Sequence, residues 1–554
     1  MTELFKTIWY TKKRFVGKKG IFLFALLKRL KKILWNSVKD SKNDNRKNNK
    51  EKQNEEEPAA ERNASPEESD LTGNFEKDVE TVEELFHNND TLVVRKMENR
   101  NGKTIKFCIM YIDGMVNSLM INQNVVFPIE NAEIGPQENA LDHIFNQVIL
   151  ISEIEKTAKV EKILEAIVSG DTVLFVENSD NVLLLNTKGF THRSVTEPES
   201  EKILRGPREG FTEVLLENLS MLRRRIGTQD LKMKFKILGK RTKTKACVCY
   251  IEGLVNPKIL DELYRRLDKL NMDGTLDVNY ISEIIKDSPL TTFKTIGDTE
   301  RPDVVAARLL EGRVAVLLNG TPVAITVPYL FIENFQNNED YYVNFYYASI
   351  QRLVRMAGFL ITVYFPAFYV AVMTYHQEIL PTPMLVSVST ARESVPFPTV
   401  IEVFIMIFVF MVISETGVRM PVGIGHALSI VGALVIGQAA VDAKLISAPV
   451  IIIVALTGIT GLMVQKLNAS IIVYRTLILL LASFTGIVGI AFGTGFLIIH
   501  LFNIRSFGVP YISELSFRFQ KNKDIFMRAP WWKMITRPDF AMDKVRMNTE
   551  KSDR

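Results

Sequence analysis

Two acidic side chains at the ends of a short apolar segment are the residues best placed to act on ions. Glu402 and Glu415 bound the segment 403–414 (VFIMIFVFMVIS). Carboxylates in such positions either anchor a helix at a membrane interface or form a charged ring around a cation path. The two residues are 13 positions apart, so at about 100° per residue they point about 220° apart on a straight helix. At most one of them can face a narrow pore, and Glu402 is the candidate.

The stretch that leads into Glu402 is rich in proline. Residues 379–402 read ILPTPMLVSVSTARESVPFPTVIE and contain four prolines. Irregular backbone at membrane depth is tolerated only where protein or a water-filled cavity satisfies it. A pathway would therefore be built here, and the candidate pore or gating residues are Glu402, Glu415, Pro396, Pro398, Arg392 and Glu393.

The cysteines and the absence of catalytic motifs argue against an enzyme. The three cysteines, Cys108, Cys247 and Cys249, are odd in number and widely spaced, so no disulfide framework is predicted and a reducing cytoplasm is expected. Cys247 and Cys249 could be a metal pair, but a position in a core strand is the favoured interpretation. The sequence has no P-loop, G-x-G-x-x-G, H-E-x-x-H or paired C-x-x-C motif. We therefore expect no catalytic, metal or cofactor site.

Uncharged runs long enough to cross a bilayer follow residue 353. They predict four spans, 353–375, 422–441, 445–465 and 476–504, because about 20 apolar residues cross the hydrocarbon. Pro366 should kink the first span. The region 379–420 is predicted to be re-entrant or interfacial, since its apolar core of 12 residues is short for a span.

The flanking charges predict the orientation of this block. Arg352 precedes the first span and Arg355 lies at its start, and a basic tail over 509–554 follows the last span. The positive-inside rule places both flanks in the cytoplasm, which requires an even number of crossings. Small residues such as Gly489 and Gly493 allow close helix packing, either within the chain or in an oligomer.

The region before the spans contains a repeat. The segment 107–117 (FCIMYIDGMVN) resembles 246–256 (ACVCYIEGLVN), and 163–178 resembles 305–320. Each copy reads as a buried strand and then a helix that stops at Gly170 or Gly312 before another strand. The predicted fold is an α/β soluble region of two duplicated subdomains, 81–228 and 229–345, followed by an α-helical polytopic membrane domain, 346–508.

The first 80 residues form an extension of a different kind. Residues 1–50 hold 15 Lys and Arg against 3 Asp and Glu, which fits either a solvated basic tail or an amphipathic segment on anionic lipid. No signal peptide is predicted, because the apolar run 20–27 is too short. The polar stretch from Asp40 to about Asp70 should be disordered.

Several long strings of the sequence resemble one family, the A subunits of bacterial spore germinant receptors. The strings are SVTEPESEKILRGPREGF (194–211), DTERPD (298–303), LPTPMLVSVSTARESVPFP (380–398), GVRMP (417–421), IVGALVIGQAAVDAKLIS (430–447) and SFGVPY (506–511). The resemblance implies a multi-pass protein of the spore inner membrane, with a transporter-like B subunit and a lipoprotein C subunit as partners. It also implies a non-enzymatic subunit that self-associates and conducts ions when nutrients trigger it.

The sequence departs from the family pattern in two places, and it leaves functions other than ion conduction open. Where the family usually has a REAG-like run, this chain has SETG (414–417), which removes a basic residue near the membrane. The extension 1–80 has no firm counterpart. The alternatives to a conducting subunit are a scaffold or accessory subunit of the spore dipicolinate-release machinery and a secondary transporter. No nucleic-acid partner is expected.

Overall fold

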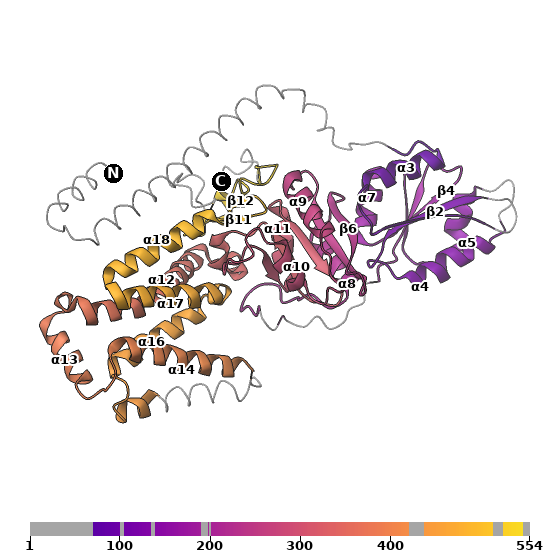
Figure 1. Ribbon diagram of the computed structural model, residues 1–554. Coiled ribbons are helices and arrows are strands. Elements are labelled where there is room, and N and C mark those ends of the chain that lie inside the picture. The colour runs from indigo at the N-terminus through magenta and orange to yellow at the C-terminus, as the bar shows by residue number, and fades with distance from the viewer. Residues whose placement is uncertain are drawn as a thin grey trace, which may run out of the picture. The chain divides into compact units, whose positions relative to one another are not determined.

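The structure is a computed structural model that describes residues 70–99, 105–133, 139–189, 198, 201–419, 437–512 and 524–546 (Figure 1). The chain divides into two units, residues 1–69 and residues 70–554, and every described residue belongs to the second. The basic arm and the polar stretch predicted to be disordered therefore lie outside the described residues, apart from its last residue, Asp70. The first subdomain begins before the predicted residue 81, because Val79 is buried in a helix that starts at Phe75.

The first sheet has five antiparallel strands in the order β1-β2-β4-β5-β3. The strands are β1 Leu92–Glu98, β2 Lys106–Ile112, β3 Ile154–Thr157, β4 Thr172–Val176 and β5 Val182–Leu185. One face is covered by α3 Phe75–Leu85 and α7 Val160–Ser169. The other face is covered by α4 Ser118–Ile121, η2 Asn122–Val126, α5 Phe127–Asn131, α6 Ala140–His143 and η3 Ile144–Val148.

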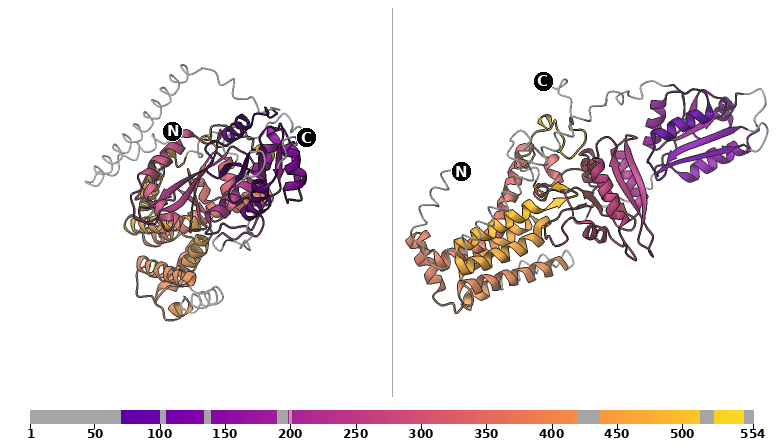
Figure 2. Two further views of the ribbon diagram at one scale, coloured as in Figure 1. Left: turned by 90° about the vertical axis from the view of Figure 1, so that its right-hand side faces the viewer. Right: turned by 45° about the horizontal axis from the view of Figure 1, so that its top comes forward.

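The second sheet repeats this order as β6-β7-β9-β10-β8. Its strands are β6 Leu231–Leu238, β7 Thr244–Ile251, β8 Gly297–Thr299, β9 Val314–Leu318 and β10 Ala324–Val327. Helices α8 Leu215–Arg225 and α11 Pro302–Leu310 cover one face, and α9 Pro257–Asp268 and α10 Val278–Ile285 cover the other. Figure 2 shows the two sheets with their helices, in indigo to purple and in magenta. The predicted α/β soluble region is confirmed.

Burial on both faces explains the uninterrupted apolar runs of the central strands. Every residue of β4 (TVLFV) and of β9 (VAVLL) is buried, because a sheet sandwiched between helix layers leaves no polar face. Cys108 and Cys247 lie at the same position of β2 and β7, and both are fully buried. Gly170 and Gly312 end the equivalent helices with φ of +95° and +80°, a conformation that glycine adopts without strain.

The predicted boundary between the subdomains at residue 228 is wrong. Helix α8 precedes it, yet Leu215, Leu219 and Leu222 pack against the second sheet and α11. Helix α8 stands before β6 as α3 stands before β1. The second repeat therefore begins with the segment that leads into α8, because packing and not sequence order decides which sheet an amphipathic helix joins.

The helical block consists of α12 Phe345–Tyr375, α13 Thr382–Arg392, α14 Thr399–Arg419, α16 Ala448–Leu462, α17 Asn468–Thr485 and α18 Ile487–Asn503. Three helical segments, Phe345–Tyr375, Thr399–Thr416 and Gln465–Thr485, are long and apolar enough to cross a membrane, and α16 and α18 are shorter apolar helices. Helix α12 runs through Pro366 and packs against α16 and α17. Most of the predicted span 422–441 lies outside the described residues.

One prediction about this block needs correction. The run 476–504 is not one helix, because α17 ends at Thr485 and α18 begins at Ile487, with Gly486 at φ +63° and ψ −137° between them. The region predicted to be re-entrant or interfacial contains α13 and α14, and α14 is a continuous helix of 21 residues. Because the apolar run extends through Glu402 to Thr399, α14 meets the length of a span, so its interfacial placement is untested.

The chain returns to the second subdomain after α18. Strands β11 Arg505–Ser506 and β12 Val509–Pro510 form a short hairpin, and the hydroxyl of Ser506 donates to the carbonyl of Thr295 at 2.6 Å. The tail 524–546, which includes η9 Trp531–Lys533, places Phe540 in the core of that subdomain. The described chain also contains short 3₁₀ segments, η4 Phe331–Asn334, η5 Asn338–Tyr341, η6 Gln377–Ile379 and η7 Gln465–Leu467.

Candidate functional site

The carboxylate of Glu402 is fully buried in the first turn of α14. Its Oε2 accepts hydrogen bonds from the backbone N–H of Ser447 at 3.0 Å and from the Ser447 hydroxyl at 2.7 Å. Ser447 is the N-cap residue of α16, so the carboxylate lies at the N-terminal end of that helix, where the helix dipole stabilises negative charge. Glu402 thereby links α14 to α16.

Arg392, the last residue of α13, supplies the opposite charge. Its Nε lies 3.6 Å from Glu402 Oε1, which is within ion-pair range but too long for a hydrogen bond. These two atoms are buried and have no hydrogen-bond partner among the described residues. The two charges attract each other without a hydrogen bond between them. A small shift of α13 would therefore be enough to form that hydrogen bond or to separate the charges.

The two prolines of the turn between α13 and α14 differ in their contacts. The carbonyl of Pro398 accepts hydrogen bonds from the N–H groups of Ile401 at 2.9 Å and Glu402 at 3.1 Å, so it fixes the backbone that carries the buried carboxylate. Pro396 and Glu393 are exposed. Of the predicted residues, the structure therefore brings together Arg392, Pro398 and Glu402.

Glu415 lies apart from this cluster, on the exposed side of α14 near its other end. Because Glu402 is buried and Glu415 is exposed, the two side chains lie on different faces of α14. Their angular spacing along the helix predicts this separation. The structure gives Glu402 protein partners in the single chain and leaves Glu415 on the surface.

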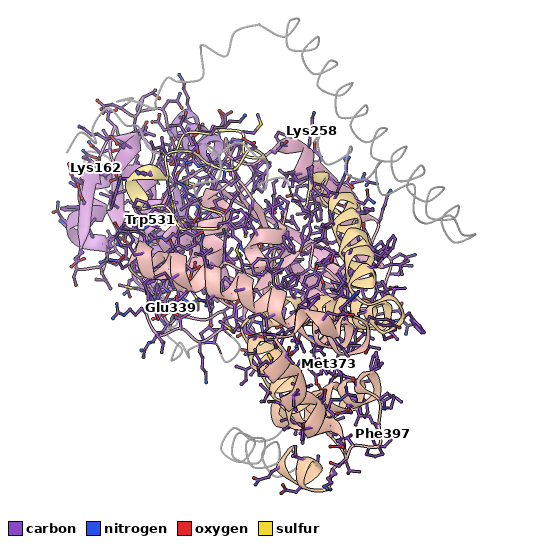
Figure 3. The ribbon with its side chains drawn as sticks, turned by 90° about the vertical axis from the view of Figure 1, so that its left-hand side faces the viewer. Lys162, Lys258, Glu339, Met373, Phe397 and Trp531 are labelled. Atoms are coloured by element: carbon purple, nitrogen blue, oxygen red, sulfur yellow. The ribbon has the colours of Figure 1, made fainter. Side chains whose placement is uncertain are left out.

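Much of the apolar surface around the cluster has no partner among the described residues. Val388 is the buried residue of α13, and α14 exposes Ile401, Ile405, Phe408, Met411 and Val412. In its most apolar window α14 is 22% buried, against 56% for α12 and 39% for the segment 465–485. Figure 3 labels Phe397, in the turn between α13 and α14, at the end of the helical block distant from Trp531.

Gly458 and Gly489 lie where the described helices of the block pack closely. A Cβ on Gly458 would lie 2.2 Å from the ring of Phe410, and one on Gly489 would lie 2.1 Å from the carbonyl oxygen of Leu481. Helix α14 thus rests against α16, and α18 folds closely onto α17. For these glycines, contact inside the chain is a sufficient reason for a small residue.

Two residues of the cluster were not among the predicted site residues. Ser447 is 45 positions from Glu402, and Tyr369 of α12 lies within electrostatic reach of Arg392 and Glu402. Ser447 had a detectable signal, because a serine followed closely by a proline marks a helix start. That signal predicts the cap but not its carboxylate partner.

The cysteines of the second sheet face each other in the protein core. The Sγ atoms of Cys247 and Cys249 are 3.8 Å apart, and burial raises the pKa of Cys247 well above its usual value. Across the described ranges, no cluster of three or more His, Cys, Asp or Glu residues could hold a metal ion. The geometry is that of buried neutral thiols.

Comparisons with known proteins agree with one another. A family model described as Bacillus/Clostridium GerA spore germination protein matches residues 80–540. The uncharacterized membrane protein YfkQ of Bacillus subtilis (strain 168) is 41% identical over 477 residues, which cover 84% of this chain and 91% of that protein. Spore germination protein KA of the same organism is 37% identical over 479 residues, which cover 85% and 88%.

One solved structure is similar to part of the chain. It is the N-terminal domain of the A subunit of the Bacillus megaterium spore germinant receptor GerK3, which is 29% identical. The match covers 48% of this chain and 98% of that chain, with a TM-score of 0.36.

Proposed function

The chain belongs to the GerA family of spore germination proteins, the A subunits of spore germinant receptors, and from that premise we propose that it is an oligomeric, ion-conducting subunit. In this proposal nutrient binding elsewhere in the receptor opens a path between copies of the chain, and released cations trigger germination. A ligand can drive such a change only through a difference in its affinity for the closed and open states.

The observation that carries the proposal is the surface of α13 and α14 that no residue in the described ranges covers. The window of α14 is less than half as buried as that of α12. Lipid can cover such a surface, and the hydroxyls of Ser387 and Thr390 already donate to carbonyls within α13. The hydroxyl of Thr382, exposed at the start of α13, favours a protein or water neighbour over hydrocarbon. We assign this helix pair to contacts between copies around the path.

The buried cluster suits a gate better than a pore ring. Glu402 is bonded to α16 and attracted to Arg392 of α13, so its charge holds three helices in one arrangement. Glu415, on the exposed side of the same helix, is the better placed of the two carboxylates to meet an ion. The gate would open when the weak Arg392 contact is exchanged for another partner.

The remaining assignments follow from the family and from the fold. The proposed partners are a transporter-like B subunit and a lipoprotein C subunit, and the two duplicated subdomains offer surfaces on which to dock them. The proposed location is the spore inner membrane, with the soluble region and the tail in the cytoplasm. Against a secondary transporter stands the place of the duplication, because transporter repeats lie in the membrane helices.

The test is a chemical cross-link between copies. Phe408→Cys places a thiol on the exposed surface of α14, and Phe496→Cys places one on a comparably exposed position of α18. The native cysteines are buried, so a bis-maleimide reagent should act only on the new thiol. We expect cross-linked oligomers from the α14 variant in membranes and monomers from the α18 variant. Monomers from both would contradict the proposal and favour a non-conducting scaffold.

A further inference from the structure

A cavity of about 440 Å³ lies where the second subdomain meets the helical block. Its lining comes from α11, from the 3₁₀ segments η4 and η5, from Arg355 of α12, from the turn between α16 and α17, and from the tail near Trp531. Figure 3 shows Trp531 on the tail beside the second subdomain. A cavity of this size is in the range of small-molecule sites.

The described lining carries an excess of positive charge. Seven lysine and arginine side chains line the cavity against three carboxylates, those of Glu201, Glu311 and Glu333. Arg301 and Arg355 are neutralised by Asp303 and Asp340, which lie outside the lining. Setting these two aside leaves five cations against three anions.

The three lining carboxylates are already engaged. Glu333 pairs with Arg313 at 2.6 Å and Arg308 at 3.6 Å, and it accepts from the N–H of Leu330 at 2.6 Å. Glu311 pairs with Arg313 and Arg546, each at 3.2 Å. They therefore have little capacity left to neutralise further lysines.

Glu201, the third carboxylate, is also occupied. It accepts hydrogen bonds from the Thr299 hydroxyl at 2.5 Å and the N–H of Glu300 at 3.2 Å. These contacts tie it to the segment before α11, and it forms no ion pair with a described lysine of the lining.

Lys466 is the cation that this arrangement leaves unmatched. It lies in η7, between α16 and α17, and its Nζ contacts the carbonyl oxygen of Gln336 at 3.4 Å. No carboxylate in the described part of the chain lies within ion-pair distance of it. Its side chain is exposed to solvent and lines the cavity.

A second lysine shares the opening. Lys202 lines the same cavity, is exposed, and forms no ion pair with any described residue. Two accessible lysines above an arginine-rich wall match the several oxygen acceptors of a phosphate group better than a single carboxylate.

We propose that this cavity binds a phosphate group, carried either by a free phosphate compound or by the headgroup of an anionic lipid. The ligand would bridge the α16–α17 turn and the second subdomain, because Lys466 belongs to the first and Arg308 to the second. Basic pockets at the ends of membrane helices are typical sites for such groups. The inference does not depend on whether the chain conducts ions.

The experiment measures the thermal stability of the purified full-length chain with two probes. In the first arm, sodium phosphate is compared with sodium chloride at matched ionic strength in detergent. In the second, nanodiscs of phosphatidylcholine are compared with nanodiscs that also contain phosphatidylglycerol. A ligand that binds only the folded state raises the midpoint with its concentration.

The variants separate the cavity from general charge effects. Lys466→Gln should weaken the response about tenfold in apparent affinity, as expected for a lost charge-assisted hydrogen bond, and Lys466→Arg should largely restore it. Lys258→Gln, on the exposed surface of α9 (Figure 3), should respond as the native chain does. Lys202→Gln tests the same cavity from its rim and is the deciding variant if Lys466→Gln does not fold.

Each outcome is decisive. A response in the phosphate arm that depends on the lysines assigns a free phosphate compound, and one in the phosphatidylglycerol arm alone assigns a lipid headgroup. The proposal is overturned if neither arm shows a response. It is also overturned if the Lys466→Gln and Lys202→Gln variants respond as strongly as the Lys258→Gln control.

Discussion

Arg352 Nη1 lies 2.7 Å from Asp524 Oδ1, although these residues stand before and after most of the helical block in the sequence. Nε of the same guanidinium is 2.8 Å from Asp340 Oδ2, and the arginine is fully buried. A contact between the start of the first long helix and the tail requires both flanks to lie on one side of any membrane that the block crosses. The contact therefore predicts an even number of crossings, as the positive-inside rule does.

Asp524→Asn should loosen the tail from the start of α12. The substitution removes the charge that meets Arg352, and hydrogen bonds to charged groups contribute about 1.5 to 3 kcal/mol; the Asp524 side chain is 31% exposed, so we expect the lower end. Limited trypsin digestion should then cut near Lys533 faster than in the native chain. Asp273→Asn, at a residue with a 77% exposed side chain, is the control, and equal cleavage rates for both variants would contradict the role of the contact.

The duplicated subdomains predict which substitution the first repeat tolerates. Asp78 Oδ1 accepts from the N–H of Thr72 at 2.9 Å and its hydroxyl at 2.7 Å, and Asn218 accepts from the same groups of Thr212 in the second repeat. Asp78→Asn should therefore cost less than about 1 kcal/mol of unfolding free energy, and Asp78→Ala about 1 to 2 kcal/mol.

The measurement is thermal or urea unfolding of the soluble region within the full chain. Because the asparagine of the second repeat also donates to the carbonyl of Thr212 at 2.6 Å, Asp78→Asn can form the equivalent bond to Thr72. If Asp78→Asn lowered the free energy of unfolding as much as Asp78→Ala, the negative charge of Asp78, and not the shape of its side chain, would be what stabilises the contact with Thr72. That result would contradict the prediction.

The sequence predicted the soluble fold because its signals are local. Buried strands and helix-ending glycines can be recognised without knowing the tertiary structure, and Gly170 and Gly312 end their helices as predicted. The assignment of α8 failed because its apolar face shows that it packs, but not against which sheet. The break at Gly486 was missed because a run without charge gives no indication of where one helix ends.

The candidate site was predictable only in part, for a similar reason. The acidic residue before an apolar segment identified Glu402, and the proline-led stretch identified Arg392 and Pro398. The hydrogen bonds of Glu402, however, are made with Ser447, which lies 45 residues later in the sequence and caps a helix. Pairings over such distances are set by the packing of α14 on α16, which periodicity does not encode.

The three cysteines should be unreactive in the folded chain. Burial raises the pKa of Cys108 to about 12 and that of Cys247 well above its usual value, so the reactive thiolate is scarce at pH 8. Iodoacetamide should label the native chain slowly and the chain unfolded in urea about fully, as measured by intact mass. Rapid labelling of the native chain would contradict the buried strands.

The same thiols give a pH dependence with a defined sign. In the unfolded chain a thiol ionises near pH 8.5, whereas Cys108 stays neutral up to about pH 12. The unfolded state therefore loses protons first, and the free energy of unfolding should fall between about pH 8.5 and 12. Cys108→Ser removes the titrating thiol, so the free energy of unfolding of this variant should fall less steeply with pH. An unchanged pH dependence would contradict the role of Cys108.

Glu402→Gln should change gating, because it removes the charge that attracts Arg392 while keeping the shape of the side chain. Taking one partner from a buried ion pair costs about 3 kcal/mol or more, so the closed arrangement should lose stability and the variant should leak ions without nutrient. Glu415→Gln is the matched control. It should not leak ions without nutrient, but it should alter the conductance or ion preference of the open state. Equal, native-like behaviour of both variants would remove these carboxylates from the mechanism.

Ion flux through liposomes that contain the purified chain with its B and C partners tests the central claim most directly. The account predicts cation release when a nutrient mixture is added, little release without it, and constitutive release from Glu402→Gln. An intact reconstituted complex that binds nutrient but releases no ions above the level of empty liposomes would contradict conduction by this chain.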